Sequence, residues 1–435
     1  MRQPRRRSSP LKLIFLAGLV AFLVYVNQTI EPLSSSLFLP SPTPTISPEE
    51  FITEAEDLVR QGKYAMALQA YDNAIRTDPQ NPAYYIAAAR LYIYSGQYEK
   101  AIENASNAVL LKQDSSMGEA LRGLAHGLTG NYLEAEGSLN RSIELDPGNA
   151  AAYAYFSIVL SNKVILGQEV LGDLDRAIEA SRNAQSIAPD ALETHWARGI
   201  ILEVTGNYEE AVSELEQAIA QNANIAELHI ALGRNYRFLG RNDLAVEYFT
   251  RANALNPGDP NPDLYISRTY SNIGEFAKAI LYAEQAVSDA PADPFLYGNL
   301  GVMYRKNFEL DKALLTLKLA VRGGLTPEGV EVKGIPISYE GRVAEFYYNY
   351  GLTLMDLGYC SEAVDIAQTL IQTVPNDEIA VYNSEAVIIE QCYQKINDLQ
   401  MLKLPTPTML PTWTPRPTST PTMEPTVIPS ATAMP

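Results

Sequence analysis

The sequence predicts an all-α fold built from a stack of antiparallel helix pairs, and two observations lead to this prediction. First, a small residue returns every 34 residues over most of the chain. Second, the apolar residues between these positions follow the spacing of helical faces, and glycine and proline divide them into two helices. A fixed interval of this length is typical of units that stack into an extended array.

The amino end has a basic head, residues 1–10, followed by an apolar run at residues 11–26. This order predicts a transmembrane signal anchor at 11–26, with the head in the cytoplasm and the rest of the chain outside. Two alternatives stay open. One is a cleaved signal peptide, which would leave a secreted protein, and the other is a buried helix of a soluble protein.

Two segments are rich in proline, serine and threonine: residues 27–47 and residues 400–435. Chains of this composition do not bury enough apolar surface to form a core. We expect 27–47 to be an extended stalk and 400–435 to be a disordered Pro/Thr-rich tail with polyproline II character.

The array is predicted to cover residues 48–397. Glycine stands five residues before the small residue in every unit but the eighth, which has Phe308, and glycine there permits a positive φ between two helices. Proline follows the small residue after twelve positions in most units and ends the second helix. The small residues that define nine units are Ala67, Ala101, Ala135, Ala177, Ala211, Ala245, Ala279, Ala313 and Ala363.

Two intervals are longer than the others and indicate insertions. One insertion lies near 164–171, between the two helices of the fourth unit, and the other near 326–341, between the eighth and ninth units. We expect each to be a loop at the edge of the array. A tolerated surface insertion is the favoured interpretation, and a binding loop is the alternative. Residues 377–399 are predicted to form a closing helix that covers the apolar end of the array.

The pattern resembles the tetratricopeptide repeat family. The 34-residue period, the small residue at positions such as Ala89 and Gly233, and the terminal proline agree with it, while Tyr85 and His195 stand where the family has tryptophan. The resemblance implies an α-solenoid, a right-handed superhelix of antiparallel helix pairs with about nine repeats plus the closing helix. It also implies a protein–protein interaction scaffold.

The sequence contains no recognisable catalytic or metal site. Three histidines and two cysteines have no metal-ligand spacing, and no nucleophile motif or phosphate-binding loop is present. We interpret His126, His195 and His229 as core residues. The chain is therefore expected not to be an enzyme and to need no cofactor. Its formal net charge of −18 argues against nucleic acid as a partner.

A basic cluster is predicted on the concave groove of units five to eight. Such a cluster could hold an acidic protein or peptide, or a C-terminal carboxylate, through charge-assisted hydrogen bonds. The alternative is that these arginines pair with acidic neighbours such as Glu203 and form a solvated face. The candidate residues are Trp196, Arg234, Arg237, Phe238, Arg268, Asn272, Arg305 and Lys306.

The two cysteines are placed at helix ends that the fold brings together. Cys360 opens the second helix of the ninth unit, and Cys392 lies near the end of the closing helix. A disulfide and two separate buried thiols are both open. A disulfide would stabilise the folded state by roughly 3–4 kcal/mol through loop closure.

These observations lead to one main hypothesis about function: a non-enzymatic, membrane-anchored scaffold that binds a protein or peptide in the groove of an extracytoplasmic array. The alternative is a cell-envelope structural or spacer protein that contacts wall glycan or self-associates.

Overall fold

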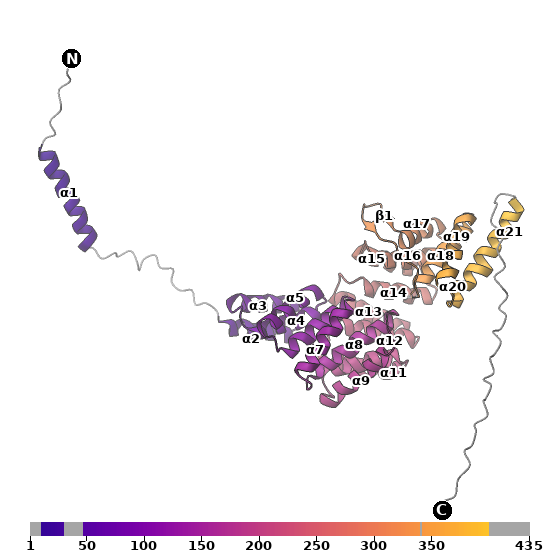
Figure 1. The fold of residues 1–435 in the computed structure, drawn as a ribbon, viewed down its shortest axis with the longest axis horizontal. Coiled ribbons are helices and arrows are strands. Elements are labelled where there is room, and N and C mark those ends of the chain that lie inside the picture. Colours follow the sequence, from indigo (N-terminus) through magenta and orange to yellow (C-terminus); the bar gives the residue numbers. More distant parts are fainter. Residues whose placement is uncertain (1–9, 30–46, 340–341, 400–435) are drawn as a thin grey trace, which may run out of the picture.

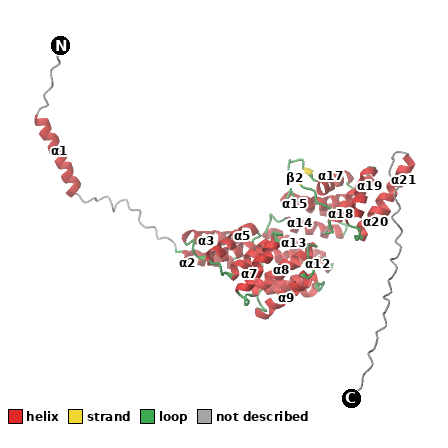
Figure 2. Ribbon diagram, viewed as in Figure 1, coloured by secondary structure: helices red, strands yellow, loops and turns green. Residues whose placement is uncertain are grey.

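The computed structural model describes residues 10–29, 47–339 and 342–399 (Figure 1). The basic head up to residue 9, most of the predicted stalk and the predicted tail at 400–435 lie outside these residues. Almost all of the described chain is helical (Figure 2), and consecutive helices from α2 onward pack as antiparallel pairs. The predicted all-α solenoid is confirmed.

Each of the nine units contributes one pair. The first five are α2 (Pro48–Arg60) with α3 (Tyr64–Thr77), α4 (Pro82–Tyr94) with α5 (Tyr98–Leu111), α6 (Ser116–Leu128) with α7 (Tyr132–Leu145), α8 (Ala150–Leu166) with α9 (Asp173–Ile187), and α10 (Leu192–Val204) with α11 (Tyr208–Gln221). The last four are α12 (Ala226–Phe238) with α13 (Asn242–Leu255), α14 (Pro260–Asn272) with α15 (Phe276–Asp289), α16 (Pro294–Lys306) with α17 (Leu310–Arg322), and α18 (Val343–Asp356) with α19 (Cys360–Thr373).

Local sequence explains where these helices begin and turn. Asp259 caps α14, its carboxylate accepting a hydrogen bond from the backbone of Asn261 at 2.9 Å, and proline fills the first helical position. Between the two helices of a unit the backbone takes a positive φ, as at Gly96 with φ of 71°. Phe308 takes the same conformation, with φ of 61°, although it has a side chain.

The predicted small residues lie where the two helices of a unit cross, and the alanines that define the units are all fully buried. Glycine serves the same purpose in the first helices: a Cβ on Gly233 would come within 2.6 Å of the ring of Phe249 on α13. Of the histidines, His195 and His229 are buried as expected, whereas His126 is only half-buried.

The stack winds tightly enough for the first unit to touch the end of the fifth. The Tyr64 hydroxyl donates a 2.7 Å hydrogen bond to the side-chain oxygen of Asn222, 158 residues further along the chain. The buried apolar residues form two main cores, one within residues 55–266 and one within 279–392. The array therefore divides into two packed halves that meet near α14.

The two insertions take defined structures. The first extends α8 to Leu166, turns at Gly167 with φ of 71°, and leads into α9. The second contains a short antiparallel pair of strands, β1 (Gly324–Leu325) and β2 (Glu331–Val332), whose Val332 is buried. This second insertion is therefore partly packed into the array, and it adds a small β element to the predicted all-α fold.

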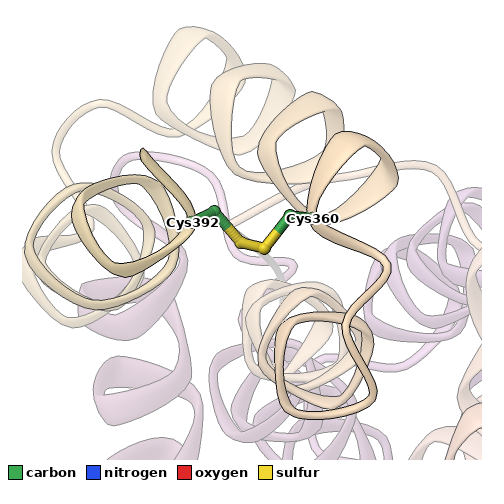
Figure 3. The surroundings of a disulfide bond; sticks show 2 residues. All are labelled: Cys360 and Cys392. Carbon is green, nitrogen blue, oxygen red and sulfur yellow. A yellow bond between two sulfur atoms is a disulfide. The ribbon is translucent and has the colours of Figure 1, made fainter. Parts of the chain in front are cut away.

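The predicted closing helix is present, in three consecutive parts. These are α20 (Glu378–Tyr382), a π-helical stretch η1 (Asn383–Ile389) and α21 (Glu390–Leu399). A disulfide between Cys360 and Cys392 joins this helix to the start of α19, with the two Cα atoms 5.3 Å apart (Figure 3). Of the two alternatives for the cysteines, the structure contains the disulfide.

At the amino end, Pro10–Thr29 form α1, and its side chains from residue 14 to residue 25 are exposed. Among the described residues, no helix combines the length and the apolarity that crossing a membrane requires. The anchor at 11–26 stays a prediction.

Candidate functional site

A cavity of about 750 Å³ lies where the two halves of the array meet. Its walls come mostly from the first helices of units five to eight, which is the region where the basic groove is predicted. Residues of both insertions also line it, including Leu166 from the first and Ile335 from the second. The insertions were expected to be surface loops, and the cavity shows that they help to shape the groove.

Arg234 on α12 is the deepest of the basic residues in this cavity. Its guanidinium makes two hydrogen bonds to the carboxylate of Glu203 on α10, at 2.6 and 2.8 Å. Burial by itself would lower the pKa of Arg234, but the Glu203 carboxylate outweighs it and raises the pKa. The predicted alternative, pairing with Glu203, thus holds for this arginine, and Arg234 serves mainly to join two units.

Arg237 and Arg268 are different, because neither lies within ion-pair distance of a carboxylate in the described part of the chain. Nε of Arg237 and Nη2 of Arg268 are buried and have no hydrogen-bond partner there. Arg268 has one long polar contact, 3.4 Å from its Nε to Oδ1 of Asn299. Burial lowers the pKa of both side chains, and burial together with the Arg342 charge brings the pKa of Arg268 to about 9.

Aromatic rings support these guanidiniums. Arg237 and Arg268 each lie 5.9 Å from the centre of the Tyr265 ring, and Arg268 is also 5.3 Å from the Phe295 ring. Phe238 stacks on Tyr208 with ring centres 4.8 Å apart. Cation–π contacts of this kind hold a guanidinium in place without neutralising its charge.

A fourth arginine, Arg342, follows the second insertion and lines the same cavity. It pairs with Glu345 of the next helical turn, with Nη2 2.6 Å from Oε1, and its Nη1 donates to Oδ1 of Asn299 at 3.1 Å. Asn299 therefore accepts from both Arg268 and Arg342 and holds the two like charges side by side.

The predicted groove residues separate into two groups. Arg234, Arg237, Phe238 and Arg268 line the cavity. The other four do not. Trp196 is only 2% exposed and belongs to the core. Asn272 and Lys306 are exposed outside the cavity, and Arg305 pairs with Asp356 at 3.0 Å.

Many lining residues were not named as groove residues from the sequence, and Tyr265, Phe295 and Arg342 are the ones that contact the guanidiniums or add a charge. Phe295 lies on α16, the helix for which the groove residues Arg305 and Lys306 were predicted, so its place in the repeat contained a signal for it. Arg342 has no equivalent position in the 34-residue repeat, so the repeat pattern does not predict that it lines the cavity.

The arrangement is suited to bind an anion. Two partly buried guanidiniums, without ion-pair partners among the described residues, offer unused N–H donors in a cavity whose walls are partly apolar, where a charge-assisted hydrogen bond is stronger than in water. Within the described residues, no group of histidine, cysteine, aspartate or glutamate side chains is arranged to hold a metal ion.

Comparison with known proteins agrees with the repeat assignment. Models of the tetratricopeptide repeat match residues 58–125, 169–224 and 197–260. The chain is 34% identical over 110 residues to a small glutamine-rich tetratricopeptide repeat-containing protein 2 of Mycosarcoma maydis, a match that covers 23% of this chain and 31% of the relative. It is 26% identical over 121 residues to an Hsp70-Hsp90 organising protein of Plasmodium falciparum, covering 28% and 48%.

The chain thus spans less than half the length of these relatives. Among solved structures, yeast Tom70 aligns with a TM-score of 0.43 and 13% identity, covering 82% of this chain and 99% of that one.

Proposed function

We propose that this chain, which carries tetratricopeptide repeats, is a non-enzymatic scaffold that binds an acidic segment of a partner protein in the cavity between its two halves. The observation that carries the proposal is the pair of partly buried guanidiniums, Arg237 and Arg268, without carboxylate partners among the described residues. Keeping such charges buried costs stability, and an anionic ligand would remove that cost. The relatives, one of them named as an organising protein, support an interaction role.

Binding is tested with the full-length chain and a fluorescein-labelled peptide of glutamate and leucine residues. We expect fluorescence anisotropy to show binding that weakens as salt rises, because the contact is electrostatic. Arg268→Gln should weaken it at least tenfold, since a charge-assisted contact is worth about 1.5–3 kcal/mol. Arg141→Gln is the matched control: Arg141 forms an exposed ion pair with Glu144 outside the cavity. Equal binding by Arg268→Gln and the native chain would rule out this site.

The proposal includes a location: residues 11–26 anchor the chain in a membrane, and the array lies on the extracytoplasmic side. The basic head before the apolar run supports this orientation, and so does the Cys360–Cys392 disulfide, because disulfides persist in oxidising compartments. Leu133 is 83% exposed, so Leu133→Cys provides a surface thiol in the array. A membrane-impermeant maleimide should label this thiol in intact cells. Labelling only after lysis would place the array on the cytoplasmic side.

A further inference from the structure

The first insertion is held in place by a buried network of charges. Nζ of Lys163, at the end of α8, lies 2.6 Å from Oδ2 of Asp173 and 3.0 Å from Oε1 of Glu136. Asp173 is fully buried, and its carboxylate also accepts a 3.0 Å hydrogen bond from the backbone of Val170 inside the insertion. These contacts hold the insertion against unit three.

This fixed insertion presents mainly apolar side chains to the cavity, with the polar Gln168 beside them. Val164, Ile165 and Leu166 line the cavity together with Phe238 of α12. Leu166 is 48% exposed and Phe238 is 53% exposed. Exposed apolar side chains are common on surfaces, but these two share a cavity with the unpaired guanidiniums, and this combination indicates a contact with a ligand.

The second insertion forms another fixed part of the wall. The backbone N–H of Ile335 donates to the carbonyl of Ala320 at 2.9 Å, and the carbonyl of Ile335 accepts from the Tyr347 hydroxyl at 2.6 Å. Ile335 lines the cavity, as does Arg342 a few residues later. Each insertion thus adds apolar wall to a groove in which Arg234, Arg237 and Arg268 come from the regular helices and Arg342 follows the second insertion.

We propose that the insertions make the cavity selective for an acidic segment that carries a large apolar side chain close to its carboxylate. The carboxylate contacts Arg237 and Arg268, and the apolar side chain packs against Leu166 and Phe238. This inference rests on the proposed function and adds an apolar contact to the contact with the carboxylate. Charge alone would accept any acidic segment, whereas the apolar wall discriminates by burying a complementary side chain.

The test uses the full-length chain and two labelled peptides, the glutamate–leucine peptide and the same peptide with alanine in place of leucine. The native chain should bind the leucine peptide at least ~10-fold more tightly, the preference that burial of a few methyl(ene) groups produces. Leu166→Ser should reduce this preference to less than about threefold and leave the salt dependence unchanged. Arg268→Gln should weaken both peptides alike and reduce the salt dependence.

Leu133→Ser is the matched control, because Leu133 is also an exposed leucine on a helix but lies outside the cavity. Circular dichroism checks that both serine variants keep their helices. A preference for leucine that survives Leu166→Ser would overturn the inference and leave the proposed function standing. Failure of both peptides to bind the native chain would overturn the proposed function and this inference with it.

Discussion

The hydroxyl of Tyr98 donates a hydrogen bond to the carboxylate of Glu227, although the two residues are 129 positions apart in the chain. The contact joins α5 of the second unit to α12 of the sixth, and Arg234 and Arg237 of the cavity lie on this same helix α12. The packing of the second unit therefore helps to position α12, which carries two of the cavity's charges.

Stability should fall as pH rises from 5 to 8. Burial, followed by the nearby Asp259 charge, raises the pKa of Glu227 from its usual 4.5 to about 7. Between these values the folded state retains a proton that the unfolded state has lost, so the free energy of unfolding decreases with pH, by about 2 kcal/mol or less for this group. Burial also raises the pKa of Asp263, to about 6, and acts in the same direction.

Glu227→Gln keeps an acceptor for Tyr98 and removes the titration. Urea unfolding at pH 5 and pH 8 should therefore show a smaller difference for this variant than for the native chain, and the variant should be the more stable of the two at pH 8. An unchanged pH difference would mean that Glu227 is ionised in the folded state at both pH values.

Removing the charge at Arg268 should stabilise the protein. The pKa of Arg268 is lowered by burial and by Arg342, which means that its charge is unfavourable in the folded state at neutral pH. We expect Arg268→Gln to raise the free energy of unfolding by about 1–2 kcal/mol and to raise the melting temperature. Arg234→Gln should have the opposite effect, because it leaves Glu203 buried without its partner. If both substitutions changed the free energy of unfolding in the same direction, this distinction would be contradicted.

Adding a methyl group at Gly233 should destabilise the array. Its Cβ would approach the fully buried Phe249 ring to 2.6 Å, so the helices of unit six must move apart. We expect Gly233→Ala to cost about 1–3 kcal/mol in urea unfolding. Gly137, on the exposed side of α7, has nothing within 4 Å of its Cβ position, and Gly137→Ala should stabilise by about 0.5–1 kcal/mol.

Replacing Phe308 by glycine, the residue at this position in the other units, should stabilise the protein. It is 87% exposed and holds a positive φ of 61°, a conformation that costs a residue with a side chain about 1 kcal/mol. Phe308→Gly should therefore raise the melting temperature, whereas Phe308→Ala, which keeps a Cβ, should not. A stabilising effect of alanine equal to that of glycine would assign the change to the lost ring instead of the backbone.

Reduction of the disulfide should loosen the carboxyl end first. The Cys360–Cys392 bond closes a separation of 32 residues, and its loss is expected to cost about 3–4 kcal/mol by the loop-entropy estimate. Hydrogen exchange of the Cys360→Ser, Cys392→Ser double variant should quicken in α21 and η1 before it changes in α4 or α5. Thiol titration of the unfolded native chain should detect no free thiol until a reductant is added.

The repeat pattern was sufficient to predict the helix pairs, their turns and the closing helix, because each depends on residues within a few tens of positions. The crossing of α12 and α13 needs only a small residue at Gly233 and Ala245, and both positions can be identified from the 34-residue spacing. The cysteine pairing needed one further fact, that the closing helix packs beside α19.

The cavity, in contrast, was decided by the tertiary structure. Arg234 and Arg237 are three residues apart on one helix, yet one is paired and the other is not, because Glu203 from the preceding unit is within hydrogen-bonding distance of only the first. Leu166 belongs to the first insertion and Arg342 directly follows the second, and the 34-residue repeat places neither of them. Local sequence determines where helices form. The superhelical winding, which depends on many contacts between units, determines which of their side chains line the same cavity.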